Sequence, residues 1–206
     1  MMTRIYILTF SFLVIINAYG SLKGSPHDFS GKGWSGGDLC ITCHTPHNAK
    51  NGQIDAPLWN RNATTTNYTV YKSNTLKAQV GQPTSTTKLC LSCHDGSIAV
   101  DSFGNLAGGT KYQNDFNNGN LNSHSPLHPF SFIYDSALAT AVGTIYDPTT
   151  KITELGGTIA QDLLMGPLKN RFECTSCHDI HNKYNRNKIL KIPKTNSRLC
   201  LTCHQL

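Results

Sequence analysis

The longest apolar run of the chain lies at its N-terminal end. Residues 5–18 are predominantly apolar, follow Arg4 and lead into Ala18-Tyr19-Gly20, in which small residues alternate. This order is typical of a secretory signal peptide. We expect residues 1–20 to be a signal peptide and the mature chain to be exported; an uncleaved anchor is the alternative. No other stretch approaches the roughly 20 apolar residues of a spanning helix, so we expect no membrane span after cleavage.

Beyond that run, long helical or strand periodicity is scarce. Residues 97–170 are rich in Gly, Asn, Ser and Thr, and pairs such as Asp95-Gly96 and Asn118-Gly119 are turn signals. Only residues 134–144 and 158–165 favour a helical turn or two. The pattern predicts a chain that is mostly coil with few short helices and strands, with short helices at the cysteine motifs described next.

Every cysteine falls into one repeated pattern, Cys-x-x-Cys-His. The cysteines are Cys40, Cys43, Cys90, Cys93, Cys174, Cys177, Cys200 and Cys203, and the histidines that complete the four copies are His44, His94, His178 and His204. Two thiols at this spacing add across the two vinyl groups of one haem, and the next histidine is held beneath the iron. The sequence therefore predicts four covalently bound c-type haems with these histidines as proximal ligands.

Disulfides and zinc are the other uses of such cysteines. An exported chain with eight cysteines is compatible with four disulfides. The spacing of the third and fourth copies also approaches that of a zinc ribbon. Neither alternative explains why a histidine directly follows each pair, so we adopt the haem interpretation.

Composition and charge agree with haem. Hydrophobic residues make up 38% of the chain, a share that includes the apolar N-terminal run. This is low for a side-chain core, and four haems would supply the missing apolar volume. The formal charge of +6 falls to near +1 after removal of Arg4 and addition of about −1 for each ferric haem. We therefore expect no nucleic-acid partner.

The remaining histidines match the number of haems. Of nine histidines, the five that are not proximal are His27, His47, His124, His128 and His181. Met165 is the only methionine after residue 20, so we expect bis-histidine iron in each haem. The expected distal ligands are His27, His47, His128 and His181, and the choice between His124 and His128 stays open.

Two of these candidates repeat one spacing. His47 follows His44, and His181 follows His178, by three residues. A side chain so close cannot reach the far face of its own haem, but it can reach a second haem packed alongside. We therefore expect two doubled units, in which His47 binds the haem held by His94 and His181 binds the haem held by His204.

A single tetrahaem domain, residues 21–206, follows from this pairing. We place the first haem pair at about 21–96, a loop-rich insert at about 97–170 and the second pair at about 171–206. The haems held by His44 and His178 would then draw their distal ligands from His27, His124 and His128.

Flanking sequences extend the pattern beyond the haem motifs. They are His27-Asp-Phe-Ser, Gly33-Trp-Ser-Gly-Gly, Cys-His-Thr-Pro-His-Asn after Thr42, Pro57-Leu-Trp-Asn, Leu89-Cys-Leu-Ser-Cys-His-Asp-Gly, His128-Pro-Phe-Ser and the final Cys200-Leu-Thr-Cys-His. In these strings and their order the chain resembles the OmcE-type tetrahaem c-type cytochromes, which form extracellular cytochrome nanowires. The resemblance runs from about residue 27 to residue 204.

The resemblance implies a head-to-tail homopolymer that conducts electrons outside the cell. In such a filament a histidine of one subunit ligates a haem of the next; His27 is the expected inter-subunit ligand, and the haem held by His178 is its expected acceptor. Redox proteins or extracellular acceptors would be the other partners, and the location would be secreted or cell-surface. The alternatives are a monomeric periplasmic electron shuttle and, if one iron keeps an open axial position, a reductase.

Overall fold

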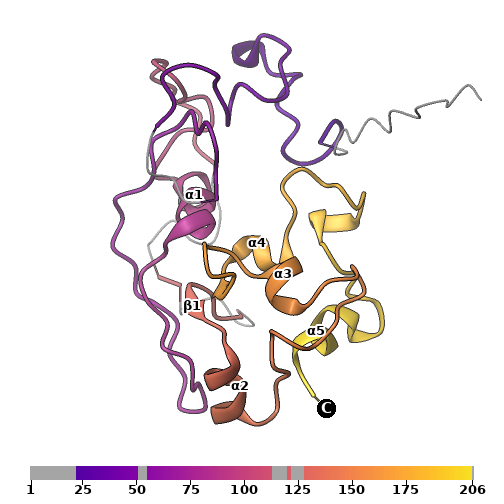
Figure 1. Ribbon diagram of the computed structural model, residues 1–206. Helices are drawn as coiled ribbons and strands as arrows, with labels where there is room; N and C mark the ends of the chain where they lie inside the picture. The colour runs from indigo at the N-terminus through magenta and orange to yellow at the C-terminus, as the bar shows by residue number, and fades with distance from the viewer. Residues whose placement is uncertain (1–21, 51–54, 113–119, 122–127, 206) are drawn as a thin grey trace, which may run out of the picture.

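The protein is mostly coil, held together by short helices and one small sheet. The computed structural model describes residues 22–50, 55–112, 120–121 and 128–205 (Figure 1). In this part of the chain the helices are α1 (Ser85–His94), α2 (Ser136–Val142), α3 (Ile159–Leu163), α4 (Cys174–Cys177) and α5 (Arg198–Cys203), with 3-10 turns at Gly33–Ser35, Asn187–Ile189 and Thr195–Ser197. Strands β1 (Phe132–Ile133) and β2 (Arg171–Phe172) form the sheet. The mostly-coil architecture expected from the sequence is confirmed.

Two expectations lie outside the described residues. They are the signal peptide of residues 1–20 and the position of His124. Where the chain is described, none of its helices combines the length and the apolar character needed to cross a bilayer.

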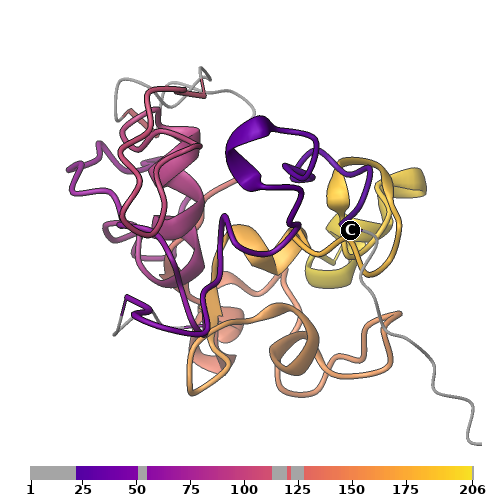
Figure 2. The same cartoon turned by 90° about the horizontal axis from the view of Figure 1, so that it is seen from above.

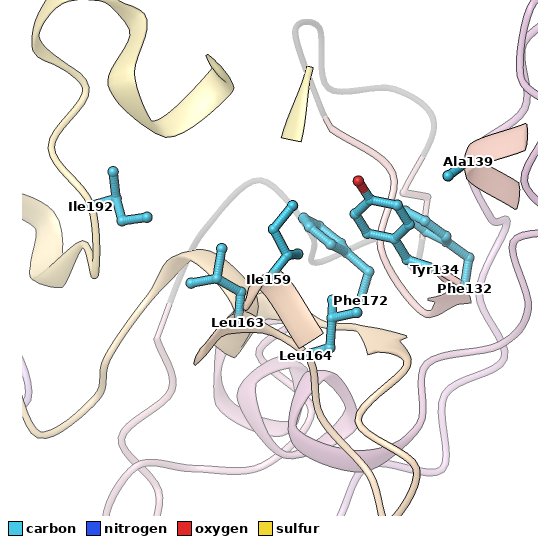
Figure 3. Packing of buried hydrophobic residues seen from close by; sticks show 8 residues of the cluster. All are labelled: Phe132, Tyr134, Ala139, Ile159, Leu163, Leu164, Phe172 and Ile192. Atoms are coloured by element: carbon cyan, nitrogen blue, oxygen red, sulfur yellow. The ribbon is translucent and has the colours of Figure 1, made fainter. Parts of the chain in front are cut away.

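The main apolar core forms between the two-stranded sheet and helix α3. β1 and β2 pair antiparallel with Phe132 opposite Phe172, and the two rings lie nearly parallel with centroids 5.1 Å apart. Ile159 and Leu163, four residues apart on α3, present one helix face to this core (Figure 3). The buried members of the cluster are Phe132, Tyr134, Ala139, Ile159, Leu163, Leu164, Phe172 and Ile192.

Local sequence explains the two helices of this half. The Asp135 side chain accepts a hydrogen bond from the Leu138 amide (2.9 Å) and begins α2, and Gly143 ends it at φ 74°. Thr158 and Gln161 form a capping box at the start of α3. The helical turns expected at residues 134–144 and 158–165 are therefore confirmed.

Three of the four Cys-x-x-Cys-His motifs lie on helices. The cysteines of the second, third and fourth motifs are on α1, α4 and α5, and α4 lies between the other two in both views (Figures 1 and 2). Thr86 of α1 and Thr175 of α4 join through their hydroxyls at 2.6 Å. The Cys174 amide also donates to the Thr87 hydroxyl (2.9 Å). These bonds fix the second motif against the third.

The first motif departs from the expectation of a helix at each motif. Residues 40–44 form one turn, in which the amides of Cys40 and Ile41 donate to Asp38 Oδ1 and the His44 amide donates to the Cys40 carbonyl (2.8 Å). Gly36 and Gly37 precede it at φ 62° and 83°, so no helix enters from that side. One isolated turn does not offset the cost of helix nucleation, and the chain leaves the turn at once.

Replacement of Ile159 by alanine should destabilise the protein. Ile159 is 0% exposed at the centre of the core, and truncation of such a side chain costs about 2–5 kcal/mol. The midpoint of denaturant unfolding should fall accordingly. Ile152→Ala, at a side chain that is 59% exposed, is the matched control and should change the free energy of unfolding by less than about 0.5 kcal/mol. If both variants lowered the free energy of unfolding equally, this core would not be a main source of stability.

Candidate haem-binding site

The eight cysteines form four pairs of free thiols, and the pairs neighbour one another in chain order. Burial is the main cause that raises the pKa of Cys93, and the nearby Cys43 contributes to the rise. A hydrogen bond between Cys90 and Cys174 raises the pKa of the former and lowers that of the latter. Burial, assisted by Cys177, raises the pKa of Cys203 to about 12. Cys43 therefore lies near Cys93, Cys90 near Cys174, and Cys177 near Cys203. Each motif is thus next to the one that follows it along the chain.

The zinc alternative needs several of these side chains around one point. Among the described residues, no three His, Cys, Asp or Glu side chains gather in a way that could hold a metal ion. The third and fourth motifs thus do not form the four-ligand site of a zinc ribbon. Two separate thiols followed by a histidine remain the unit at each motif, as covalent haem attachment requires.

Three motifs share the same backbone arrangement around the proximal histidine. In each, the amide after the histidine donates to a carbonyl of a distant segment, and the amide two residues further along that segment donates back to the second cysteine. The bonds are Thr45 to Leu58 (2.8 Å) and Asn60 to Cys43 (2.9 Å); Asp179 to Ile189 (2.7 Å) and Lys191 to Cys177 (2.9 Å); Gln205 to Thr144 (2.8 Å) and Tyr146 to Cys203 (2.8 Å). The second motif instead keeps its histidine within α1.

This arrangement orients two of the proximal imidazoles. His44 Nδ1 lies 2.8 Å from the Pro57 carbonyl oxygen, and His178 Nδ1 lies 3.0 Å from that of Lys188. A carbonyl accepts a hydrogen bond, so in each case the proton belongs on Nδ1 and the Nε2 lone pair is left for a metal. His128 has the same relation to the Pro129 carbonyl, at 2.7 Å. In these three imidazoles Nε2 is therefore free of the proton and available to a metal.

Three pairs of imidazoles lie at one characteristic separation. Ring centroids are 6.0 Å apart for His27 and His94, 6.2 Å for His44 and His181, and 6.2 Å for His128 and His204. A metal–nitrogen bond of about 2.0–2.1 Å, plus roughly 1.1 Å from nitrogen to ring centre, puts two ligands of one metal about 6 Å apart. Each pair joins a proximal histidine to one from another part of the chain, so these residues fit bis-histidine iron.

The pairs differ from those expected within each doubled unit. His181 lies beside His44 rather than His204, and His27, not His47, lies beside His94. The reason is tertiary. The chain turns after the third motif, where the Asn182 amide donates to the Asp179 carbonyl (2.8 Å), and this turn carries His181 to the first motif rather than the fourth.

Burial favours the neutral imidazole at three of these positions. Burial is the main cause that lowers the pKa of His27 to about 4, and the charges of His94 and His178 add to it. Burial also lowers the pKa of His94 and of His128. Only a neutral imidazole offers its lone pair to a metal, so these lowered pKa values favour the form that could bind one.

Two histidines stand apart from the three pairs. His47 and His178 are both exposed, and in the described part of the chain neither has another imidazole at the separation of the pairs. His178 lies near enough to His27 and His94 to lower the pKa of each. His47 contributes to the turn after the first motif through its backbone: its carbonyl accepts a hydrogen bond from the Thr45 hydroxyl (2.8 Å).

Apolar side chains gather around the motifs at the surface. Ile41 and Leu201, which lie between the cysteines of their motifs, are 42% and 39% exposed, and Leu58 beside the first motif is 55% exposed. Tyr112 meets the His94 ring edge-on at 4.9 Å. Haem faces are apolar, so these side chains fit contact with them.

Arg61 is a residue of the site that the sequence did not indicate. It is buried, and it donates to the carbonyl of Thr42 within the first motif and to that of Ala99 after the second. A single arginine between two asparagines carries no motif, so no signal in the sequence marked it.

Comparison with known proteins supports the haem interpretation. Residues 166–205, which contain the third and fourth motifs, match the family model described as a doubled CXXCH motif. No curated protein matches the chain. The match and the repeated motif indicate covalently attached c-type haem and support a multihaem c-type cytochrome that carries electrons rather than an enzyme.

Proposed function

We propose that the chain is an exported tetrahaem cytochrome that polymerises head to tail and conducts electrons along the resulting extracellular filament. The observation that carries this proposal is the arrangement of the four attachment motifs, each next to the following one in chain order, with three imidazole pairs at 6.0–6.2 Å. Neighbouring haems in a row are what electron conduction through one subunit requires.

The chain's own residues hold and insulate the redox groups. Bound haem would supply the one-electron chemistry, by alternation of its iron between the ferric and ferrous states. The cysteines would hold each haem covalently, and each of the three histidine pairs would hold the iron of one haem. Iron that is ligated on both faces keeps no site for a substrate, which favours an electron carrier over a reductase.

The two exposed histidines outside the pairs support a polymer. On one chain His178 offers a proximal ligand without a described distal partner, and His47 offers an imidazole without a proximal one. A ligand on one face and its acceptor on another form a heterologous contact, which generates an open filament when it does not close into a ring. In this proposal His47 of one subunit ligates the haem held by His178 of the next.

This assignment moves the inter-subunit role away from His27. The resemblance to the OmcE-type cytochromes implied His27 as the inter-subunit ligand. Its imidazole is instead buried beside His94 of the same chain at 6.0 Å, so an intrachain role fits it better. The acceptor expected from the sequence, the haem held by His178, is retained.

A monomeric periplasmic shuttle is the second candidate. It would follow if His124, which lies outside the described residues, ligates the fourth iron within the chain. His47 would then be a surplus surface histidine. The pattern of residues 1–20 supports export in either case.

Electron microscopy of the native extracellular fraction tests the proposal. We expect unbranched filaments with haem absorption, with four haems per chain in the pyridine haemochrome assay. Subunits that remain monomeric at high concentration, with every haem low-spin, would refute the filament and leave the shuttle. A high-spin haem in the resting protein would instead favour the reductase.

A further inference from the structure

Arg61 is a buried cation that has no carboxylate partner among the described residues. It is only 4% exposed. Its guanidinium donates to the backbone carbonyls of Thr42 (3.1 Å), Val100 (3.0 Å) and Ala99 (2.5 Å). Its Nε is buried with no acceptor in that part of the chain. Carbonyls orient the guanidinium but leave its charge in place, and an uncompensated buried charge acts strongly on its surroundings.

The guanidinium lies between the first two haem-attachment motifs. Thr42 separates the two cysteines of the first motif, and Ala99 and Val100 follow the second. Because the guanidinium donates to the carbonyls of these three residues, its charge lies against the segments that carry the cysteines. The cysteine sulfurs are the points at which haem would be joined to the chain, so the charge would act at the edges of two haems.

Two other cations near the motifs have carboxylates beside them. Arg171 pairs with the buried Glu173 at 3.1 Å, and the amine of Lys191, which donates to the Asp162 carbonyl (3.0 Å), lies near Asp179.

The second motif has its own negative charge. The Asp95 carboxylate is 5% exposed and directly follows His94. At the first motif the Asp38 carboxylate accepts from the amides of Cys40 and Ile41, but it is exposed, so solvent screens its charge. The charge of Arg61 is buried, and the excess positive charge therefore falls on the first motif.

We propose that Arg61 raises the reduction potential of the haem carried by the first motif above the potentials of the other three. The inference rests on the proposed attachment of haem at that motif. One electron converts ferric to ferrous iron and removes one positive charge, with no proton or bond transferred, so a fixed cation nearby favours the reduced form. Electrons that enter a subunit from a neighbouring haem or an external reductant then settle first at the His44 end.

An optical redox titration of the haem-loaded protein tests this role. We expect one step of the wild-type curve to lie above the rest. In Arg61→Gln this step should move to lower potential by at least about 59 mV. For a one-electron couple this shift corresponds to a tenfold change in the ratio of oxidised to reduced haem. Arg61→Lys keeps the positive charge, so it should change the ratio of oxidised to reduced haem at that step by less than threefold.

A second variant tests the sign of the effect. Asp95→Asn removes a negative charge while the side chain keeps nearly the same shape. It should move a different step of the curve to higher potential. If the two residues acted only on the structure, the potential shifts in Arg61→Gln and Asp95→Asn would not be expected to have opposite signs. Lys77→Gln, at an exposed lysine outside all four motifs, is the surface control and should leave the curve unchanged.

Several outcomes would overturn the proposal. They are an unchanged curve in Arg61→Gln, equal shifts in the glutamine and lysine variants, or a downward shift in Asp95→Asn. If the glutamine variant does not load four haems, the wild-type curve decides, because a curve with one potential for all haems excludes a raised first haem. Failure of the filament is a separate result, since the titration applies equally to soluble subunits.

Discussion

Replacement of His47 by alanine is expected to abolish filament formation while each chain keeps four covalent haems. The imidazole is exposed, has no described histidine partner and follows the first motif at the surface, so its loss removes an inter-subunit bond and no intrachain pair. The free subunit should elute as a monomer and contain one high-spin haem, the one held by His178. Electron microscopy, size-exclusion chromatography, the haem count and the absorption spectrum measure these four effects.

The matched variants separate His47 from its surroundings and from His27. Lys50→Ala changes a neighbouring exposed side chain and should leave the filaments intact. His27→Ala should create a high-spin haem within each subunit without preventing contact between subunits. Filaments that persist in His47→Ala but vanish in His27→Ala would return the inter-subunit role to His27.

Replacement of His128 by alanine should convert one of the four haems from low-spin to high-spin iron. Its imidazole lies 6.2 Å from that of His204, and the Pro129 carbonyl directs its Nε2 toward a metal. Without it the iron held by His204 has an open face, which should bind carbon monoxide with a stoichiometry of one per chain. Absorption and electron paramagnetic resonance spectra measure the change, and added imidazole should restore the low-spin state.

This variant also decides between the two histidines that the sequence left open. If all four haems stay low-spin and bind no carbon monoxide, His128 is not a ligand and His124 becomes the candidate. His181→Ala is the matched positive control, because its imidazole pairs with that of His44. It should produce the same spectral change at a different haem.

The chemistry of attachment is readable from the sequence because it is local. Cys40, Cys43 and His44 lie within five residues, so their relation to one haem is set by covalent geometry. The helical turns of α2 and α3 are equally local, since Asp135 and Thr158 supply the caps that begin them. Even so, local pattern predicted a helix at the first motif, where the preceding glycines leave a single turn.

The pairing of the imidazoles is a different kind of property, because it depends on long-range contacts. His181 is three residues from His178 but meets His44, and His27 meets His94 from far along the chain. Nothing in the spacing of these residues states which motif lies alongside which. Arg61 shows the same limit, because only the folded chain reveals that its charge is buried without a carboxylate among the described residues.

The sequence by itself determined the cofactor chemistry, the supply of histidines and the coil-rich fold, because motif spacing and composition act over a few residues. Only the tertiary structure decided which imidazoles face one another, that His47 and His178 lie apart from the three pairs, and where the buried charge of Arg61 acts. Those relations depend on the packing of α1 against α4 and on the turn after the third motif, in which residues distant in sequence are brought within ligand distance.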